Sequence, residues 1–189
     1  MSCRTPLTRT IFAWIALSLA LALTSGCAAF SDDPRTRTPG QMFDDEVLES
    51  MIKRQIQNSS QEFESAHLEV VSYNGIVLIA GQVASGDLKE RAETVARDVA
   101  KVRSVHNELE IGGPISYPAR TNDGRLTTKV KTRLAASSDV DANRLKVVTE
   151  NGTVFLMGLT GREHAEAAVR ETQSVYGVQK IVKVFEYLD

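Results

Sequence analysis

The sequence predicts an α+β protein built from two tandem copies of one αββαβ module. Residues 67–83 and 144–160 share seven identical residues in a single register, 77 positions apart. In both segments Asn-Gly separates two short runs rich in β-branched residues, which is a strong signal for a hairpin with a type I′ turn. Helical patterns of apolar residues stand before and after each hairpin, and a further β-rich run ends each copy. We therefore expect each module to be a three-stranded mixed sheet with two helices on one face.

The beginning of the chain has the layout of a secretory signal peptide. Its first ten residues include two arginines and no acid, residues 11–23 are apolar apart from Ser18, and small residues follow. The apolar run is shorter than the roughly 20 residues that span a bilayer. These features predict a cleaved signal peptide over residues 1–26. The alternative is a short membrane anchor that stays uncut.

Cys27 is the single cysteine that remains once residues 1–26 are removed, so it cannot form an internal disulfide. The sequence TSGC, with Leu23 just upstream, resembles a bacterial lipobox, although Thr24 stands where lipoboxes prefer leucine. The resemblance implies that Cys27 carries a covalent lipid and becomes the N-terminus. Because Ala28 follows it, and not the aspartate of an inner-membrane retention signal, the resemblance also implies anchoring at the outer membrane. The alternative is an ordinary secreted protein with an incidental cysteine.

The rest of the chain divides into a tether and two modules. Residues 27–42 contain the lipidated cysteine and small, polar residues with proline and glycine, which predict a flexible tether. The first module is predicted over residues 43–112 and the second over residues 122–189. Proline and glycine also mark residues 113–121, which we interpret as the linker between them.

The helices of both modules are predicted from apolar residues at helical spacing. In the first module these are Val47, Leu48, Met51, Ile52 and Ile56, and then Leu88, Ala92, Val95, Ala96 and Val99. In the second module they are Leu126, Val130 and Leu134, and then Ala165, Ala168, Val169, Thr172 and Val175. The final strands are expected at residues 104–111 and 180–188.

Composition and motifs argue against two classes of function. The full chain has a net charge of −2, and its first 26 residues contribute two positive charges and no negative one, which leaves −4 for the rest. Such a chain is a poor general binder of nucleic acid. Its three histidines are dispersed, and no nucleophile motif or phosphate-binding loop is present. We expect no enzyme, no metal site and no cofactor other than the covalent lipid on Cys27.

The first helices of the two modules differ in charge. The first has four acidic residues, Asp44, Asp45, Glu46 and Glu49, whereas residues 120–133 contain five basic residues and one acid. Arg125, Lys129 and Arg133 share one helical face beside the apolar stripe. Such a pair of stripes is typical of a helix on an anionic lipid surface. A basic helix face that is merely solvated gives the same pattern.

The two copies, with VVSYNGIVLIAG at residues 70–81 and VVTENGTVFLMG at residues 147–158, resemble BON domains. Together with the lipobox and the tether, they make the chain similar to the outer-membrane lipoproteins that contain two BON domains. The resemblance implies a lipid-anchored, non-enzymatic protein at the periplasmic face of the outer membrane. It also implies binding of anionic phospholipid, chiefly phosphatidylglycerol, and a role in outer-membrane integrity and at the division site.

By the same resemblance, the phospholipid site lies on the first helix of the second domain. The candidate residues are Arg125, Leu126, Thr128, Val130, Lys131 and Arg133, with Gly158 as a nearby structural position. The type member of the family has an aromatic residue at the position of Arg125. The resemblance therefore implies a shallower and more electrostatic contact in this chain, which is more sensitive to salt.

A second hypothesis is a protein-interaction module, because BON domains also occur in soluble periplasmic stress proteins. The acidic first helix would then dock a basic protein partner, and Cys27 would be the sole lipid contact. Vesicle binding by a chain that lacks Cys27 distinguishes the two hypotheses.

Overall fold

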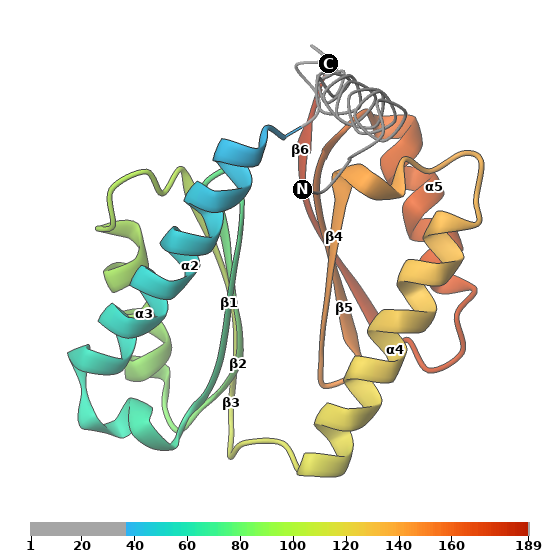
Figure 1. The fold of residues 1–189 in the computed structure, drawn as a ribbon. Helices are drawn as coiled ribbons and strands as arrows, with labels where there is room; N and C mark the ends of the chain where they lie inside the picture. Colours follow the sequence, from blue (N-terminus) through green and yellow to red (C-terminus); the bar gives the residue numbers. More distant parts are fainter. Residues whose placement is uncertain (1–36, 189) are drawn as a thin grey trace, which may run out of the picture. The chain divides into compact units, whose positions relative to one another are not determined.

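The computed structural model describes residues 37–188, which belong to one compact unit, Pro34–Asp189. The predicted signal peptide, Cys27 and most of the predicted tether lie outside the described residues. Figure 1 shows two copies of one arrangement, each with two helices against one face of a three-stranded sheet. The predicted α+β fold with two αββαβ modules is confirmed. Within residues 37–188, no helix has the length and apolar character that a membrane span requires.

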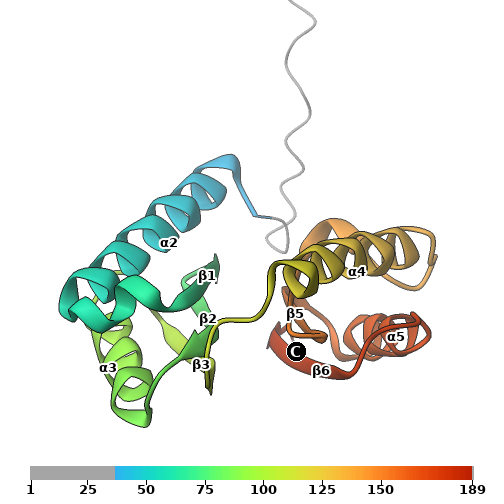
Figure 2. The same cartoon turned by 90° about the horizontal axis from the view of Figure 1, so that it is seen from below.

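Each domain has the same order of elements, which carry the labels of Figure 1 and are seen from below in Figure 2. In domain 1 they are helix α2 (Pro39–Ser59), strands β1 (His67–Tyr73) and β2 (Ile76–Val83), helix α3 (Gly86–Arg97) and strand β3 (Ser104–Ile111). In domain 2 they are α4 (Tyr117–Ala135), β4 (Leu145–Glu150), β5 (Thr153–Thr160), α5 (Arg162–Gln173) and β6 (Lys180–Tyr187). A short 3₁₀ turn precedes the first strand of each domain, η1 (Gln61–Ser65) or η2 (Ala142–Arg144).

The first helix of each domain begins earlier than predicted, α2 inside the predicted tether and α4 inside the predicted linker. Pro39 and Pro118 lie in the first turns of these helices, where the missing N–H of a proline leaves no bond unmade. The hydroxyls of Thr38 and Ser116 cap the two helices, each accepting a hydrogen bond from the backbone N–H three residues on. The prolines predicted as breakers thus stand at helix starts, and the linker shortens to residues 112–116.

Both Asn-Gly segments are hairpin turns with positive φ at the two central residues, as predicted. Asn74 and Gly75 have φ values of 53° and 74°, and Asn151 and Gly152 have 48° and 73°. The first two strands of each sheet are antiparallel, and the third strand pairs in parallel with the second. The sheet orders are β1-β2-β3 and β4-β5-β6, so the predicted mixed sheets are confirmed.

A buried carboxylate on α2 holds the first hairpin turn. Asp45 accepts hydrogen bonds from the backbone N–H groups of Asn74 at 2.8 Å and Gly75 at 3.1 Å. It also accepts one from the hydroxyl of Ser72 at 2.7 Å. Burial raises the pKa of Asp45, but the hydrogen bonds from Ser72, from the turn and from Arg37 outweigh it, so the pKa lies below its ordinary value. The helix and the hairpin are therefore fixed to each other by one ionised group.

Domain 2 repeats this clamp with Asp123 on α4. Its carboxylate accepts hydrogen bonds from the backbone N–H groups of Asn151 and Gly152, both at 2.9 Å. In the sequence Asp123 is the one acid in a basic segment, and the structure gives it a local role in the fold.

Each domain has its own core between its helices and its sheet. Three residues of each predicted apolar stripe on the first helices supply much of it, all at 5% exposure or less. They are Leu48, Ile52 and Ile56 on α2, and Leu126, Val130 and Leu134 on α4. These stripes cover the sheets of their own domains. Val47 and Met51 were also predicted on the stripe of α2, but they are exposed, because they lie on the side of the helix that faces away from the sheet.

The other faces of the two sheets meet in a third apolar cluster. Its buried members are Val71, Tyr73, Leu78 and Ala80 of domain 1 and Phe155, Met157 and Val184 of domain 2. The central strands β2 and β5 are therefore buried on both faces. This explains why both read as almost continuous apolar runs, although each contributes to a sheet of only three strands.

The polar contacts around this cluster occur in pairs that the repeat relates. The turn residue Asn74 donates a hydrogen bond from Nδ2 to Glu186 on β6 at 3.1 Å. Its counterpart Asn151 donates one from Nδ2 to Glu110 on β3, also at 3.1 Å. The register of the strands makes Glu110 and Glu186 equivalent positions as well. Such reciprocal contacts characterise a two-fold interface, which here joins two halves of one chain.

Replacing Met157 with aspartate is expected to separate the domains without unfolding either. Met157 is fully buried in the cluster between the sheets and is not a member of either helix–sheet core. A carboxylate there would lose its hydration without gaining a partner, so the sheets would part. Proteolysis at residues 112–116 should accelerate while the far-ultraviolet circular dichroism stays unchanged. Met42→Asp, at an exposed methionine of α2, is the matched control, and equal cleavage rates in both variants would contradict the prediction.

Candidate functional site: the basic face of α4

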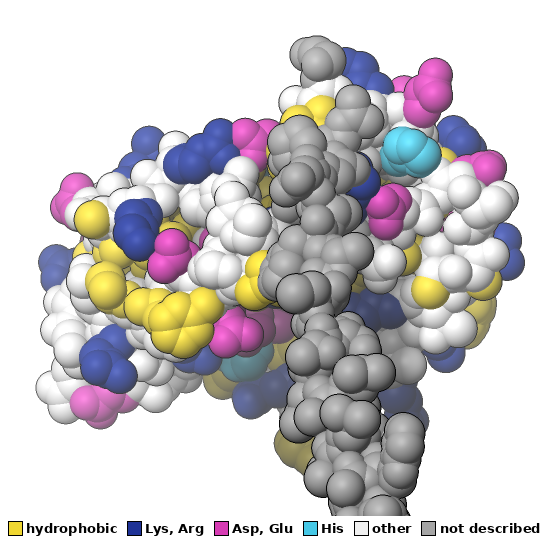
Figure 3. Space-filling model, turned by 45° about the horizontal axis from the view of Figure 1, so that its top comes forward, with side chains coloured by type: hydrophobic (Ala, Val, Ile, Leu, Met, Phe, Trp, Pro, Cys, Tyr) yellow, Lys and Arg dark blue, Asp and Glu magenta, His cyan; other side chains and the backbone are white. Residues whose placement is uncertain are grey.

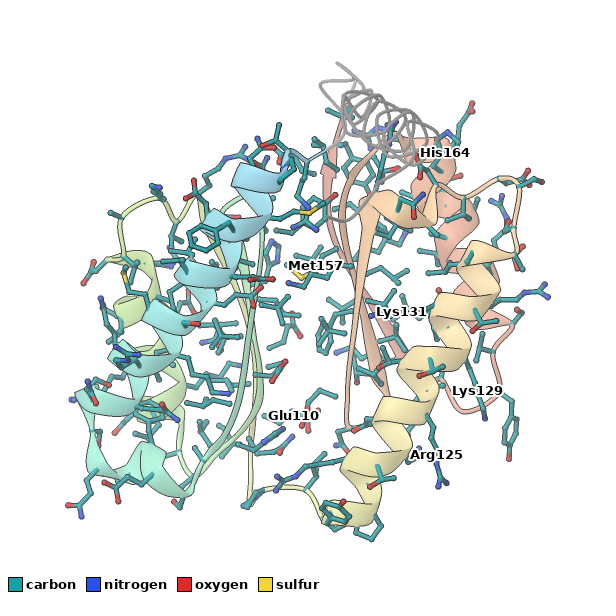
Figure 4. All side chains as sticks on the ribbon, viewed as in Figure 1. Glu110, Arg125, Lys129, Lys131, Met157 and His164 are labelled. Atoms are coloured by element: carbon teal, nitrogen blue, oxygen red, sulfur yellow. The ribbon has the colours of Figure 1, made fainter. Side chains whose placement is uncertain are left out.

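The exposed side of α4 is basic. Arg125, Lys129, Lys131 and Arg133 are all exposed, and so is Thr128 between them. Arg133 forms an ion pair with Glu171 of α5, with 2.6 Å between Nε and Oε2. Arg125 and Lys129 have no such partner within residues 37–188. Figure 4 shows both side chains pointing away from the sheet of domain 2, where an external ligand would reach them.

Three members of the predicted phospholipid site are buried. Leu126 is 3% exposed and Val130 is fully buried, because the apolar stripe of α4 covers its own sheet. Neither side chain can contact lipid while α4 is packed. Gly158 is buried in β5, where a Cβ atom would lie 2.5 Å from the carbonyl oxygen of Arg144. Gly158 thus serves close packing of the sheet, which agrees with the structural position expected for it.

Lys131 lies on another side of the helix. Figure 4 shows it across α4 from Arg125 and Lys129. Lys131 lines a polar groove of about 380 Å³ together with residues of both domains, among them Glu49 and Glu69 of domain 1. The predicted set therefore does not form one surface, and Arg125 and Lys129 share the face of α4 that points away from the sheet of domain 2.

The repeat gives α2 an apolar stripe at the positions where α4 is basic. With the buried stripes of the two helices aligned, Val47 corresponds to Arg125. Met51 corresponds to Lys129 in the same way. Val47 and Met51 are exposed, as is Phe43, and all three line a shallow groove of about 510 Å³. Figure 3 shows apolar side chains gathered on the surface of domain 1. The two domains thus present equivalent helix faces of opposite chemistry.

Three of the four acidic residues on α2 are engaged within the chain. Asp45 clamps the hairpin, Asp44 forms an exposed ion pair with Lys101 at 3.3 Å, and Glu49 forms one with Lys146 of domain 2 at 2.6 Å. The acidic surface predicted to dock a basic partner is therefore largely occupied by contacts within the protein.

Two of the three histidines, His67 and His164, take part in separate structural contacts. Nε2 of His67 lies 3.3 Å from Oε2 of Glu150, whose other oxygen accepts a hydrogen bond from Gln82 at 2.8 Å. Nδ1 of His164 lies 2.8 Å from the carbonyl oxygen of Asp139. Across residues 37–188, no three side chains of His, Cys, Asp or Glu are grouped so that they could hold a metal ion.

One exposed residue in a turn next to α4 was not among the predicted site residues. Tyr176, in the turn after α5, is 92% exposed. The next residue, Gly177, packs on α4, since a Cβ atom there would lie 3.6 Å from Cδ1 of Leu126. Periodicity cannot identify a single residue in a turn. The signal that could have found it is the contrast with Ala100, the equivalent residue of domain 1.

The chain matches the family model of the BON domain twice, over residues 44–113 and 122–189. It is 37% identical over 180 residues to the outer membrane lipoprotein DolP of Haemophilus influenzae, covering 95% of this chain and 92% of that protein. It is 38% identical over 156 residues to a 21 kDa hemolysin of Actinobacillus pleuropneumoniae, covering 82% and 79%. It is 25% identical over 161 residues to osmotically-inducible protein Y of Escherichia coli, covering 84% and 80%.

These similarities agree with the duplicated αββαβ fold and with the position of the domain boundary. The similarity to DolP extends beyond the two domains to most of both chains, and it supports a location in the bacterial envelope. The chain therefore belongs to the BON-domain family, as a DolP-like protein with two BON domains in tandem.

Proposed function

We propose that the protein is a non-enzymatic outer-membrane lipoprotein that binds anionic phospholipid through the exposed face of α4. The observation that carries the proposal is the pair of cations Arg125 and Lys129, which project together from one face of that helix and form no ion pair with any of residues 37–188. Each cation near an anionic lipid surface contributes about 1 kcal/mol. Phosphatidylglycerol is the headgroup that the family resemblance favours, and no cofactor is needed beyond the lipid on Cys27.

The anchor and the basic face would act together. Thr38, the cap of α2, stands eleven positions after Cys27. The extended length of this segment is at most about 40 Å, so a lipid on Cys27 would confine both domains close to the periplasmic leaflet. Headgroup binding is then intramolecular, and a weak contact suffices to orient the protein on the membrane.

This recognition would concentrate the protein where anionic lipid is enriched, including the division site, and so serve outer-membrane integrity. The relative DolP is itself named an outer membrane lipoprotein. Another relative is named for osmotic induction, which fits a role in envelope stress.

Reversing the two free charges, Arg125→Glu with Lys129→Glu, is expected to abolish binding to anionic vesicles. A chain of residues 28–189 suits the assay because it lacks Cys27 but retains every described helix, strand and core. It should sediment with vesicles that contain phosphatidylglycerol and not with phosphatidylcholine vesicles. Raising the salt concentration from about 0.1 M to about 0.5 M should weaken the binding, because the Debye length falls below about 5 Å.

Lys180→Glu with Lys183→Glu is the matched control. Both lysines are exposed on β6 in the same domain, and the change in net charge is identical. Equal loss of binding in the two double variants would show a net-charge effect and would remove the site from α4. No binding by the parent chain would remove lipid recognition altogether.

A protein-interaction role for domain 1 has one specific observation in its favour, the exposed apolar stripe of α2. Phe43, Val47 and Met51 are at least 43% exposed along this helix. Contiguous exposed apolar residues often mark protein contacts. If residues 28–189 ignore both kinds of vesicle, this stripe becomes the first surface to test for a protein partner.

A further inference from the structure

We propose that Tyr176 is the interfacial anchor of the lipid-binding face, with its ring inserted among the headgroups beside Arg125 and Lys129. The inference rests on the proposed function of α4. It adds an apolar contact to a surface that would otherwise bind by charge alone.

Tyr176 is held outward by a well-anchored turn. It is the most exposed large apolar side chain within residues 37–188. Its neighbours Val175 and Val178 pack against the core of domain 2. The backbone N–H of Gln179 also donates to the carbonyl of Gly152 at 3.0 Å, which ties the turn to the hairpin. The tyrosine therefore projects from a fixed base, which lowers the entropic cost of using it as a contact.

The fold does not require an aromatic residue at this position. Strand register makes Ala100 in domain 1 the equivalent of Tyr176, one residue after a core valine in both turns. The following residues, Lys101 and Gly177, both have positive φ, 73° and 107° respectively, so the two turns share one backbone course. Alanine satisfies this turn in one copy. The fold of domain 2 therefore does not require the exposed ring of Tyr176.

The turn lies along the flank of α4 that carries the free cations. A Cβ atom on Gly177 would lie 3.6 Å from Cδ1 of Leu126, so the turn meets the buried stripe of α4 at the residue that follows Arg125. Further along the helix, the ion pair between Arg133 and Glu171 ties α4 to α5, the helix that leads into this turn. The turn that carries the ring is thus adjacent to the helix that bears the basic face.

Tyrosine suits the boundary between headgroups and acyl chains. Its ring is apolar and its hydroxyl is polar, so tyrosine is enriched where one end of a side chain lies in an apolar region and the other end contacts water. Two cations beside it would hold lipid phosphates at the same depth. We therefore assign the surface to an anionic bilayer, because charge and amphipathic character meet there at an exposed turn of the domain.

A single tryptophan can report the position of this residue. The only tryptophan of the sequence is Trp14, so residues 28–189 contain none. Tyr176→Trp introduces one at the proposed anchor, and Phe43→Trp introduces one at an exposed aromatic position on α2 of domain 1. With phosphatidylglycerol vesicles, the emission of the Tyr176→Trp variant should shift to the blue. It should also be quenched by bromine attached near the headgroup end of the acyl chains, whereas the Phe43→Trp variant should show neither effect.

The possible outcomes distinguish a failure of the proposed Tyr176 anchor from a failure of the proposed lipid binding. If the Tyr176→Trp chain sediments with anionic vesicles but its emission stays that of a solvated indole, the anchor is wrong and lipid binding stands. If the parent chain does not sediment, both fail. If the emission of the Phe43→Trp variant responds and that of the Tyr176→Trp variant does not, the membrane contacts domain 1, which overturns the inference as well.

Tyr176→Ala supplies an independent measure. It places alanine in this turn, as in the equivalent turn of domain 1, so the midpoint of thermal unfolding should not change. Vesicle affinity should fall at least about threefold, because part of the apolar ring would no longer leave water. Tyr176→Phe should retain most of the affinity. An alanine variant that binds as well as the parent would overturn the proposal.

Discussion

Replacing Gly81 with alanine is expected to lower the thermal stability of the protein strongly, whereas the same replacement at Gly86 should have little effect. Gly81 lies in β2 with φ of +119°, a conformation that side-chain-bearing residues rarely adopt. A Cβ atom there would stand 2.0 Å from the carbonyl oxygen of His67 on the paired strand, so the backbone of β1 would have to move. Strain and lost pairing together should cost at least about 3 kcal/mol.

Thermal unfolding followed by circular dichroism measures this cost. For about 150 residues, 3 kcal/mol corresponds to a midpoint roughly 6–12 °C lower. Gly86→Ala is the matched control, because Gly86 does not have positive φ and a Cβ atom there would meet nothing closer than 3.9 Å. A midpoint for Gly81→Ala that stays within about 2 °C of the Gly86→Ala variant would show that the strands yield without strain.

Asp45→Asn should have an effect of similar size on the free energy of unfolding. The two carboxylate oxygens of Asp45 accept hydrogen bonds from two backbone N–H groups, from Ser72 and from Arg37. The asparagine side chain keeps one oxygen as an acceptor. Its NH₂ group replaces the other oxygen and would face N–H or O–H donors, to which it cannot bind as an acceptor. Leaving buried donors unpaired should cost about 2–4 kcal/mol, measured by urea unfolding at pH 7. Glu46→Gln, an exposed acid on the same helix, should change little.

The difference between Asp45→Asn and the parent should depend on pH in a defined direction. The pKa of Asp45 is lower in the folded protein than in the unfolded chain, so its ionised form stabilises the fold above the unfolded pKa near 4. That contribution disappears as the pH falls through the folded pKa. The stability gap should therefore be constant from about pH 5 to pH 7 and narrow below about pH 4. A gap that widens on acidification would contradict an ionised clamp.

The local elements of the fold could be predicted because their causes are local. Asn-Gly fixes a hairpin wherever it separates β-rich runs, and the buried residues of α2 and α4 recur at i, i+4 and i+8. The helix starts were wrong for an equally local reason. A proline in the first turn of a helix and a proline in a coil look alike in sequence, and the hydroxyl caps of Thr38 and Ser116 decide between them.

The candidate site was predicted in part. Helical spacing places Arg125 and Lys129 on one face, and the structure keeps them exposed. The same spacing placed Leu126 and Val130 with the core stripe, and the structure buries them there, so they cannot also be lipid contacts. The contact between the two sheets could not be derived from the sequence. A strand that is apolar on both faces is expected to be buried on both faces, but its sequence does not identify the element that packs against the second face.

The reciprocal contacts between the domains show what the duplication makes possible. A dimer of two identical single-domain chains would have to present the same helix face on both of its sides, whatever chemistry that face carried. When the two halves are joined in one chain, the contact between the sheets can be kept while the exposed helix faces of the two halves differ in sequence. Arginine and lysine now occupy α4 where α2 has valine and methionine, and tyrosine occupies one turn where alanine occupies the other. The protein can thus present a basic helix face on one half and an apolar helix face on the other, while both halves keep the same packing between helices and sheet.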